Sequence, residues 1–423
     1  MRRGIQLFPR MDTAALGAWF ALMLIGLATV YSCTQPLPGG SEGVHRLIGV
    51  TIVYNQMIWL VLGVVAALLC LLVPLRFFET FAFVFYGLTI AALLAVFFIS
   101  PERAGTHRWL SLGPFSLQPS ELAKVAFLFT LARFLAVREG KGPFFTVVGV
   151  FLLSLPPFLL VLKEPDLGTA LVFLILGVPM MFWSGVRASF LLALFSPLLS
   201  GLAMFYGQQV LHTDWPWAIY VVVLLFALFY SRLYMLHSVL LVVANLTTGL
   251  GIPLVWDKLH SYQQQRILTF FKPGETDHLG VGYQVYQSKV AIGSGGILGK
   301  GYLHGTQKGL AFLPERHTDF IFSVLGEELG LVGALLVIGL FLLIFVRAMR
   351  IAVKAKRPFA SLLAVGVGSY FFLQSFVNIS ITLGLLPVTG LPLPFITYGG
   401  SSMLASCLMM GLLLSVSARW SEV

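Results

Sequence analysis

Twelve long apolar segments constrain this chain more than any other feature of its sequence. Most of them reach the ~20 residues that an α-helix needs to cross the hydrocarbon core of a bilayer, and two, at 166–184 and 216–231, are shorter. The twelve segments lie at 13–33, 52–74, 77–99, 119–137, 143–162, 166–184, 187–207, 216–231, 234–256, 319–346, 359–384 and 395–418. Because backbone polar groups within lipid must pair inside the protein, each segment is predicted to be a helix. The sequence therefore predicts an all-α, polytopic integral membrane protein with about twelve transmembrane helices, forming a single membrane domain over 1–423.

The composition supports this class and excludes soluble enzymes, disordered chains and fibrous proteins. Hydrophobic residues make up 58% of the chain and charged residues 10%, whereas about 25% of an ordinary soluble domain is charged. The formal net charge of +10 is interpreted as basic cytoplasmic loops and a surface for anionic lipid, and no nucleic-acid partner is expected. The three cysteines lie inside apolar segments and the histidines are scattered, so neither a disulfide framework nor a zinc site is predicted.

The distribution of basic residues predicts the orientation of the segments. If the N-terminus is cytoplasmic, the predicted inner connections hold far more Lys and Arg than the short outer ones, as the positive-inside rule requires. Both termini are then cytoplasmic, and the long connection at 257–318 is extracytoplasmic. Nine glycines lie between Gly280 and Gly309. Apolar residues occur throughout this connection, so we expect it to be ordered and partly dipped into the membrane interface.

The string GSGGILGKG, from Gly293 to Gly301, invites interpretation as a phosphate-binding loop, but the pattern fails. Ser294 stands where the first glycine is required, and Lys300 is followed by glycine instead of Ser or Thr. The glycines are better explained by tight turns and by close approach to a lipid head group or to neighbouring helices.

Two strings place charged residues at predicted helix starts. In QPSELAK, Glu121 and Lys124 share a helix face, either as a structural ion pair or as the wall of a substrate cavity in which Lys124 faces an anionic group. In KEPDLGTA, Asp166 is expected at the N-terminus of a helix, where the helix dipole favours a negative charge. The helix dipole does not account for the charge of Glu164.

Two further strings lie near the C-terminal end. In PERHTDFIFSVLGEELG, Thr318 is a candidate helix cap, Asp319 is expected in the first helical turn, and Glu327 with Glu328 indicates a polar interior site. In LPLPFITYGGSS, prolines interrupt the helix before Ser401, and a broken helix start either binds an anion through its free N–H groups or is a simple kink.

Together these strings resemble the SEDS family of bacterial cell-wall polymerases, the RodA and FtsW type. QPSELAK, EPDLGTA, GYQVYQSKVAIGSGG, PERHTDFIF, GEELG and YGGSS occur in the family's order, from about Arg108 to the C-terminus. LHGTQ with FLPERHTDF is more similar to RodA, the elongation member that supports rod shape. The resemblance implies a multi-pass glycosyltransferase of the bacterial inner membrane that polymerises lipid II on the outer face. It also implies a class B penicillin-binding protein as the transpeptidase partner.

The resemblance also implies where the chemistry lies. The family's essential acid corresponds to Asp277, although His278 replaces the proline that commonly follows it. The residues predicted to bind substrate are Glu121, Lys124, Arg108, Glu164, Asp166, Arg316, His317, Asp319, Glu327 and Ser401. Lys124, Arg108, Arg316 or a divalent metal, Mg²⁺ or Mn²⁺, would balance the departing diphosphate, although the sequence shows no dedicated metal cage. The family commonly has ten spans, so 187–256 is predicted to contain two extra ones.

Two other classes of function remain open from the residues alone. A lipid-linked precursor flippase or an ion-coupled transporter could use Glu121, Lys124 and Glu327 as a relay, since charges within a membrane fit both classes. A scaffold that only recruits a synthase would leave Asp277 without a role. The long outer connection with its acid favours the polymerase, because a carrier does not require it.

Overall fold

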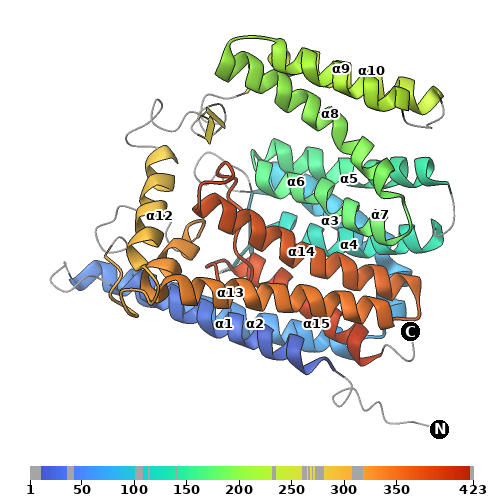
Figure 1. Ribbon diagram of the computed structural model, residues 1–423. Coiled ribbons are helices and arrows are strands. Elements are labelled where there is room, and N and C mark those ends of the chain that lie inside the picture. The colour runs from blue at the N-terminus through green and yellow to red at the C-terminus, as the bar shows by residue number, and fades with distance from the viewer. Residues whose placement is uncertain are drawn as a thin grey trace, which may run out of the picture. The chain divides into compact units, whose positions relative to one another are not determined.

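The computed structural model describes residues 11–35, 42–100, 108–112, 115–138, 142–230, 235–259, 264, 267–268, 270–271, 281–306 and 318–419. The chain divides into two compact units (Figure 1). Unit 1 comprises Met1–Gly185 and Gln284–Val423, and unit 2 comprises Val186–Tyr283.

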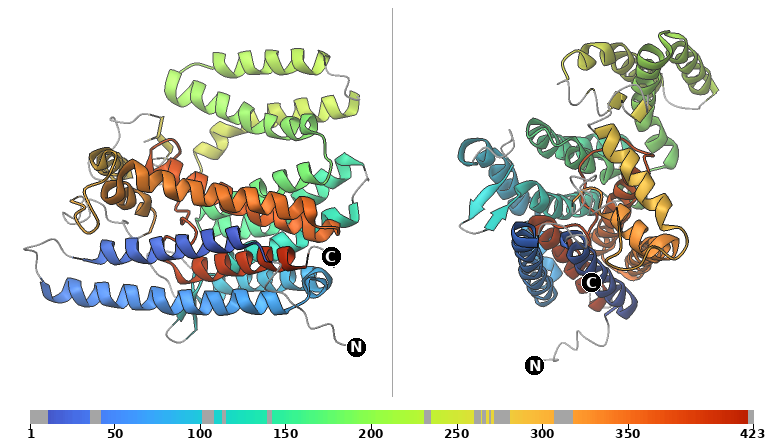
Figure 2. Two further views of the ribbon diagram at one scale, coloured as in Figure 1. Left: turned by 60° about the horizontal axis from the view of Figure 1, so that its bottom comes forward. Right: turned by 90° about the vertical axis from the view of Figure 1, so that its left-hand side faces the viewer.

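Unit 1 is a bundle of helices with a short two-stranded hairpin. Its helices are α1 (Thr13–Thr34), α2 (Glu42–Leu72), α3 (Leu75–Ile99), α4 (Pro119–Arg138), α5 (Pro143–Lys163), α6 (Leu167–Ile175), α7 (Gly177–Trp183), α13 (Ile321–Lys354), α14 (Pro358–Thr382) and α15 (Gly400–Ala418), together with α12 (Val281–Gly295), which belongs to unit 1 from Gln284 onward. The antiparallel strands β1 (Leu110–Leu112) and β2 (Phe115–Leu117) pair Leu110 with Leu117. The helix pairs of unit 1 with the most extensive contacts are α15 with α2, α13 with α14, and α3 with α4, and Figure 2 shows α1, α2 and α15 side by side.

The most polar span lies in the middle of this bundle. α4 carries four charged residues, so a position facing lipid would expose them to hydrocarbon. It instead packs against α3, α5, α14 and α15, and most of its side chains are buried. α14 and α15 are buried over most of their length as well, so the core of unit 1 consists of α4, α14 and α15.

Helices cover most of the described residues of each of the twelve apolar segments, which confirms the predicted polytopic all-α class. In the part of the chain that the structure describes, eight helices are long and apolar enough to cross a membrane. They are Thr13–Thr34, Gly49–Leu72, Leu75–Ile99, Pro143–Lys163, Ser238–Trp256, Ile321–Lys354, Pro358–Thr382 and Gly400–Ala418. The stretch Leu167–Trp183 and helix α9 (Trp215–Tyr230) are shorter apolar helices, as their sequences predict.

Two predicted helix starts are corrected by the structure. α13 begins at Ile321, its N-cap is Phe320, and no side chain caps it, so the cap predicted at Thr318 and the first-turn position predicted for Asp319 are wrong. Both residues lie in the turn before the helix. α15 begins at Gly400 instead of near 395, because Pro392 and Pro394 hold the preceding backbone outside a helix.

The long connection at 257–318 contains a helix that the sequence analysis did not predict. In α12, Val281, Val285, Ser288 and Ile292 follow helical spacing, a signal that was present in the sequence. The Ser288 hydroxyl bonds the Ser323 hydroxyl of α13 at 2.5 Å and donates to the Thr382 carbonyl of α14 at 2.6 Å. α12 is thereby fastened to one end of unit 1.

The glycines after α12 allow the backbone to lie directly on α13. The Lys300 and Gly301 amides donate to the Glu327 and Glu328 carbonyls, both at 3.0 Å. α13 is interrupted there by Gly330, whose φ of 64° an L-residue rarely adopts. The interpretation of these glycines as sites of close approach to a neighbouring helix is therefore confirmed.

Unit 2 is held together by buried polar groups. It contains α8 (Ala188–Tyr206), the π-helix η2 (Gly207–Leu211), α9 and α10 (Met235–Trp256). The Asn245 amide nitrogen donates to the Ser196 hydroxyl at 2.8 Å, and the Tyr220 hydroxyl donates to the Asn245 amide oxygen at 2.8 Å. In a bilayer the hydrophobic effect does not favour helix association, because lipid is as apolar as the helix surface, and hydrogen bonds of this kind join the helices instead. Unit 2 starts at Val186, close to the predicted 187, but the surplus of two spans stays a prediction.

We predict that Gly299→Ala destabilises the protein far more than Gly296→Ala. Both glycines have positive φ, +82° and +56°, so each alanine carries a backbone strain of about 1–2 kcal/mol. At position 299 a Cβ atom would also lie 2.1 Å from the Glu328 carbonyl oxygen, whereas Gly296 has nothing within 4 Å. Thermal unfolding of the purified proteins in detergent measures the difference. Equal unfolding temperatures for the two variants would contradict the packing described for this segment.

Candidate functional site

A buried ion pair lies in the core of unit 1. The Lys124 ammonium contacts the Glu121 carboxylate at 2.7 Å, and both side chains are almost completely buried. The ammonium also lies 5.4 Å from the centre of the Tyr370 ring on α14, a favourable cation–π position. The predicted Glu121–Lys124 contact is confirmed. The second Glu121 oxygen has no hydrogen-bond partner among the described residues, so the carboxylate retains an acceptor.

The turn between α5 and α6 brings further predicted residues to this region. The Asp166 side chain caps α6 by accepting from the Thr169 amide at 3.1 Å, and it lies near enough to Lys124 to interact electrostatically. The Arg108 guanidinium donates to the Glu164 carbonyl at 2.5 Å and to the Pro165 carbonyl at 2.8 Å. The Arg108 side chain therefore holds the turn in place by bonding to the backbone carbonyls of the turn.

The Glu164 carboxyl is the least satisfied acidic group of the turn. Its side chain is 1% exposed, and neither oxygen has a hydrogen-bond partner among the described residues. Burial and the Asp166 charge raise the pKa of Glu164 to about 8, and Arg108 opposes this only in part. Glu164 is therefore mostly a neutral acid near pH 7, able to donate a hydrogen bond as well as to accept one.

Ser401 and Asp319 each take part in a contact that joins different helices of unit 1. The Ser401 hydroxyl accepts from the Gln118 amide, the residue before α4, at 2.8 Å. The side-chain amide nitrogen of Asn378 on α14 donates to the Asp319 carbonyl at 3.1 Å, and the same nitrogen donates to the Leu391 carbonyl at 2.8 Å. The starts of α4, α13 and α15 and the end of α14 are thus joined at one end of unit 1.

Glu327 fastens the 299–306 segment to α13. Its buried carboxylate contacts the Lys300 ammonium at 2.7 Å and accepts from the Thr306 amide and hydroxyl at 2.8 and 2.9 Å. Its neighbour Glu328 accepts from the Ser32 hydroxyl of α1 at 2.6 Å. Both glutamates are buried polar groups, as expected, while the predicted contact of Glu327 with substrate stays a prediction.

Three predicted site residues, Asp277, Arg316 and His317, lie outside the described residues, as does His278. Among the residues that the structure does describe, no group of three or more His, Cys, Asp or Glu side chains could hold a metal ion. A divalent metal, Mg²⁺ or Mn²⁺, therefore stays one of the predicted alternatives for balancing the diphosphate.

The structure adds polar residues of α14 that the sequence analysis missed. Tyr370, Gln374 and Asn378 recur every four residues in an apolar span, so they share one helix face. That spacing was a usable signal. The Gln374 amide nitrogen donates to the Pro392 carbonyl at 3.0 Å, and the amide oxygen of Gln374 is buried without a hydrogen-bond partner among the described residues. This face borders the Lys124 site.

Comparisons with known sequences agree over most of the chain. The sequence model of the FtsW, RodA and SpoVE family, described as Cell cycle protein, matches residues 13–216 and 194–422. The chain is 38% identical to peptidoglycan glycosyltransferase MrdB of Escherichia coli K12, over 84% of this chain and 82% of that protein. It is 32% identical to peptidoglycan glycosyltransferase RodA of Treponema pallidum, over 99% of each.

Solved structures show the same fold. A peptidoglycan synthase complex that coordinates polymerization and crosslinking contains a chain 27% identical to this one, with a TM-score of 0.67 over 98% of this chain and 99% of that chain. The rod-shape-determining protein RodA of Thermus thermophilus is 25% identical, with a TM-score of 0.62 over 97% of this chain and 98% of that chain.

We predict that Glu121 and Lys124 are energetically coupled. Removing one partner leaves a buried charge unpaired, at a cost of about 3–5 kcal/mol. Glu121→Gln and Lys124→Met should each lower stability, and the double variant should lose much less than the sum of the two losses. Unfolding in detergent measures this double-mutant cycle. The matched control is Glu79 with Arg357, a partly exposed pair at 4.0 Å that should couple weakly. Additive losses for Glu121 and Lys124 would show that the two charges do not depend on each other.

We also predict that Glu164 makes stability depend on pH. Because the folded protein holds the proton up to about pH 8 and the ordinary pKa of the group is 4.5, the stabilisation present at low pH is lost as pH rises between these values. Glu164→Gln keeps the neutral form and should remove this component. Unfolding temperature against pH measures it, with Glu79→Gln as the control for a more exposed carboxylate. The same pH dependence in Glu164→Gln as in the wild type would refute the assignment.

Proposed function

The chain belongs to the FtsW, RodA and SpoVE family, and on this premise we propose that it is a peptidoglycan glycosyltransferase of the RodA type that polymerises lipid II into glycan strands for cell-wall elongation. The proposal rests on the sequence identity of this chain, over nearly its full length, to proteins that are named for this activity. A relationship of that extent includes the membrane core and the long connection, and it disfavours a flippase or a transporter.

The site geometry supports this activity. Polymerisation joins the 4-hydroxyl of an acceptor GlcNAc to the anomeric carbon of a lipid-linked MurNAc, with inversion, and undecaprenyl diphosphate leaves. The leaving group is strongly anionic, and cations placed beforehand stabilise it. Lys124 and Arg108 lie at the same end of unit 1, and a Mg²⁺ or Mn²⁺ ion bound by the diphosphate would add to them. The base that takes the hydroxyl proton is assigned to Asp277.

The predicted orientation supports an outer-face reaction. With the N-terminus in the cytoplasm, nine spans precede the connection at 257–318, which makes it extracytoplasmic, and three more return the C-terminus to the cytoplasm. The same parity puts the start of α4, the α5–α6 turn and the start of α15 on the outer side. Arg108 bonds to the α5–α6 turn, and Ser401 joins the start of α15 to the residue before α4, so these contacts lie on the predicted outer side. The proposed location is the bacterial cytoplasmic membrane.

The proposed partner is a class B penicillin-binding protein, a transpeptidase that cross-links the new strands. The similarity to a chain of a peptidoglycan synthase complex supports a polymerase that works together with a cross-linking enzyme. Lipid II and the lipid-linked glycan strand are the proposed substrates, so both reactants reach the site from the membrane.

We predict that Asp277→Asn abolishes polymerisation without affecting expression or insertion. An amide keeps the volume of the side chain but cannot accept the proton, and loss of a general base costs on the order of 10²–10⁴ in rate. Glycan strands made from lipid II by the purified protein are measured on gels. Asp214→Asn, at an exposed residue of unit 2, is the matched control and should retain activity. More than half of the wild-type rate in Asp277→Asn would remove Asp277 from the mechanism.

We further predict that Thr276 faces the extracytoplasmic side. In a background with Cys33, Cys70 and Cys407 replaced, Thr276→Cys should react with a membrane-impermeant maleimide in intact spheroplasts. Lys356→Cys, in the exposed connection between α13 and α14, should react only after permeabilisation. The reverse pattern would put Asp277 in the cytoplasm, away from the substrate, and the proposed topology would be wrong.

A further inference from the structure

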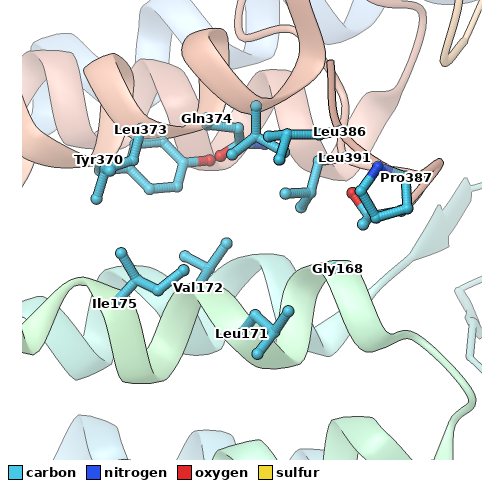
Figure 3. A pocket seen from close by; sticks show the side chains of 12 residues that line it. Gly168, Leu171, Val172, Ile175, Tyr370, Leu373, Gln374, Leu386, Pro387 and Leu391 are labelled. Atoms are coloured by element: carbon cyan, nitrogen blue, oxygen red, sulfur yellow. The ribbon is translucent and has the colours of Figure 1, made fainter. Parts of the chain in front are cut away.

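A cavity of ≈ 210 Å³ lies between α6 and α14, within unit 1. Figure 3 shows Leu171, Val172 and Ile175 of α6 on one side, facing Tyr370, Leu373 and Gln374 of α14 on the other. The segment after α14 closes one end. The lining residues are Gly168, Leu171, Val172, Ile175, Tyr370, Leu373, Gln374, Val377, Leu386, Pro387, Thr389 and Leu391.

The walls of this cavity suit hydrocarbon. Among the described residues that line it, none is charged, and the α6 wall is made of Gly168 and aliphatic side chains. Gly168 lets α6 approach the other wall, because a Cβ atom there would lie 2.4 Å from the Thr389 carbonyl oxygen. A preformed cavity with such walls binds an apolar group and excludes water.

The cavity begins where the charged site ends. Tyr370 lines the cavity, and its ring is the one that the Lys124 ammonium approaches at 5.4 Å. Gly168 lines the cavity two residues after Asp166, the cap of α6. A ligand with one charged and one apolar part could therefore place the first toward Lys124 and Arg108 and the second between α6 and α14.

The position of the cavity along the helices agrees with a ligand from the outer leaflet. It lies along the whole of α6, which forms the first half of the 166–184 segment, and along the second half of α14. The predicted orientation places both of these parts toward the extracytoplasmic side. The hydrocarbon chain of a lipid whose head group is on the outer face would lie at that depth.

We infer that this cavity holds the part of the isoprenoid chain nearest the diphosphate of the lipid-linked substrate, and so sets the position of the reacting sugar. This inference rests on the proposed function. Charge complementarity favours a polyprenyl diphosphate over a bilayer phospholipid, because a diphosphate carries more negative charge and the neighbouring Arg108 guanidinium bonds two backbone carbonyls, whereas Lys124 is paired with a carboxylate. The chain anchors the lipid laterally while the diphosphate stays beside the cation.

The first test identifies the occupant directly and needs no polymerisation. The full chain, with Leu171 replaced by p-benzoylphenylalanine, is placed in nanodiscs of phosphatidylethanolamine and phosphatidylglycerol that contain undecaprenyl diphosphate. After irradiation, mass spectrometry should find the polyprenyl adduct. The same replacement at Leu174, on α6 but outside the cavity, should give mainly phospholipid adducts. The inference would be overturned if position 171 gave only phospholipid adducts, or if positions 171 and 174 were labelled equally by the polyprenyl lipid.

The second test fills the cavity. Leu171→Trp should raise the KM for lipid II with an undecaprenyl chain by about tenfold, through lost burial of the chain, with little change in kcat. The KM for a lipid II analogue with a short, soluble chain should not change, and Leu174→Trp should behave like the wild type with both substrates. An equal effect of Leu171→Trp on both substrates would assign Leu171 to packing alone. If the wild type makes no glycan, the proposed function fails, while the cross-linking result still decides the occupant.

Discussion

The buried Lys124–Glu121 pair is the interaction on which the arrangement of unit 1 depends. Two charges in hydrocarbon are tolerated only if they are paired and removed from lipid, so α4 must lie inside a ring of other helices. This requirement explains why the most polar span is among the most buried, and why α14 supplies an aromatic face, Tyr370, to the ammonium. The core is therefore built around a charged group and not only around apolar packing.

The same end of the bundle is assembled by backbone contacts between segments far apart in the sequence. Arg108 fastens the α5–α6 turn, Ser401 joins the start of α15 to the segment before α4, and Asn378 joins α14 to the turn before α13. Glu327 fastens the 299–306 segment in the same manner. These contacts give a rigid frame, which a site needs if it is to hold a diphosphate and a sugar in a reactive geometry. Within this frame, the two carboxyl oxygens of Glu164 have no hydrogen-bond partner among the described residues.

Much of this could be predicted from the sequence, and the exceptions have physical reasons. Hydropathy located the helices of the twelve apolar segments, although not α12, and the i, i+3 spacing of Glu121 and Lys124 predicted their contact, because both depend on local sequence patterns. The start of α13 was misplaced, since Thr318 is a good capping residue by type but forms part of a turn fixed by tertiary contacts. The cavity between α6 and α14 was not predictable, because its walls come from segments about two hundred residues apart.

The central claim is that this protein forms glycosidic bonds and does not carry lipid across the membrane. The most direct measurement places the purified protein, with no other polymerase, in vesicles containing lipid II, and follows both the glycan strands and the side of the membrane on which lipid II lies. The account predicts strands longer than one disaccharide, with one undecaprenyl diphosphate released for each bond. Movement of lipid II between leaflets without any strand would contradict it and would support a transporter.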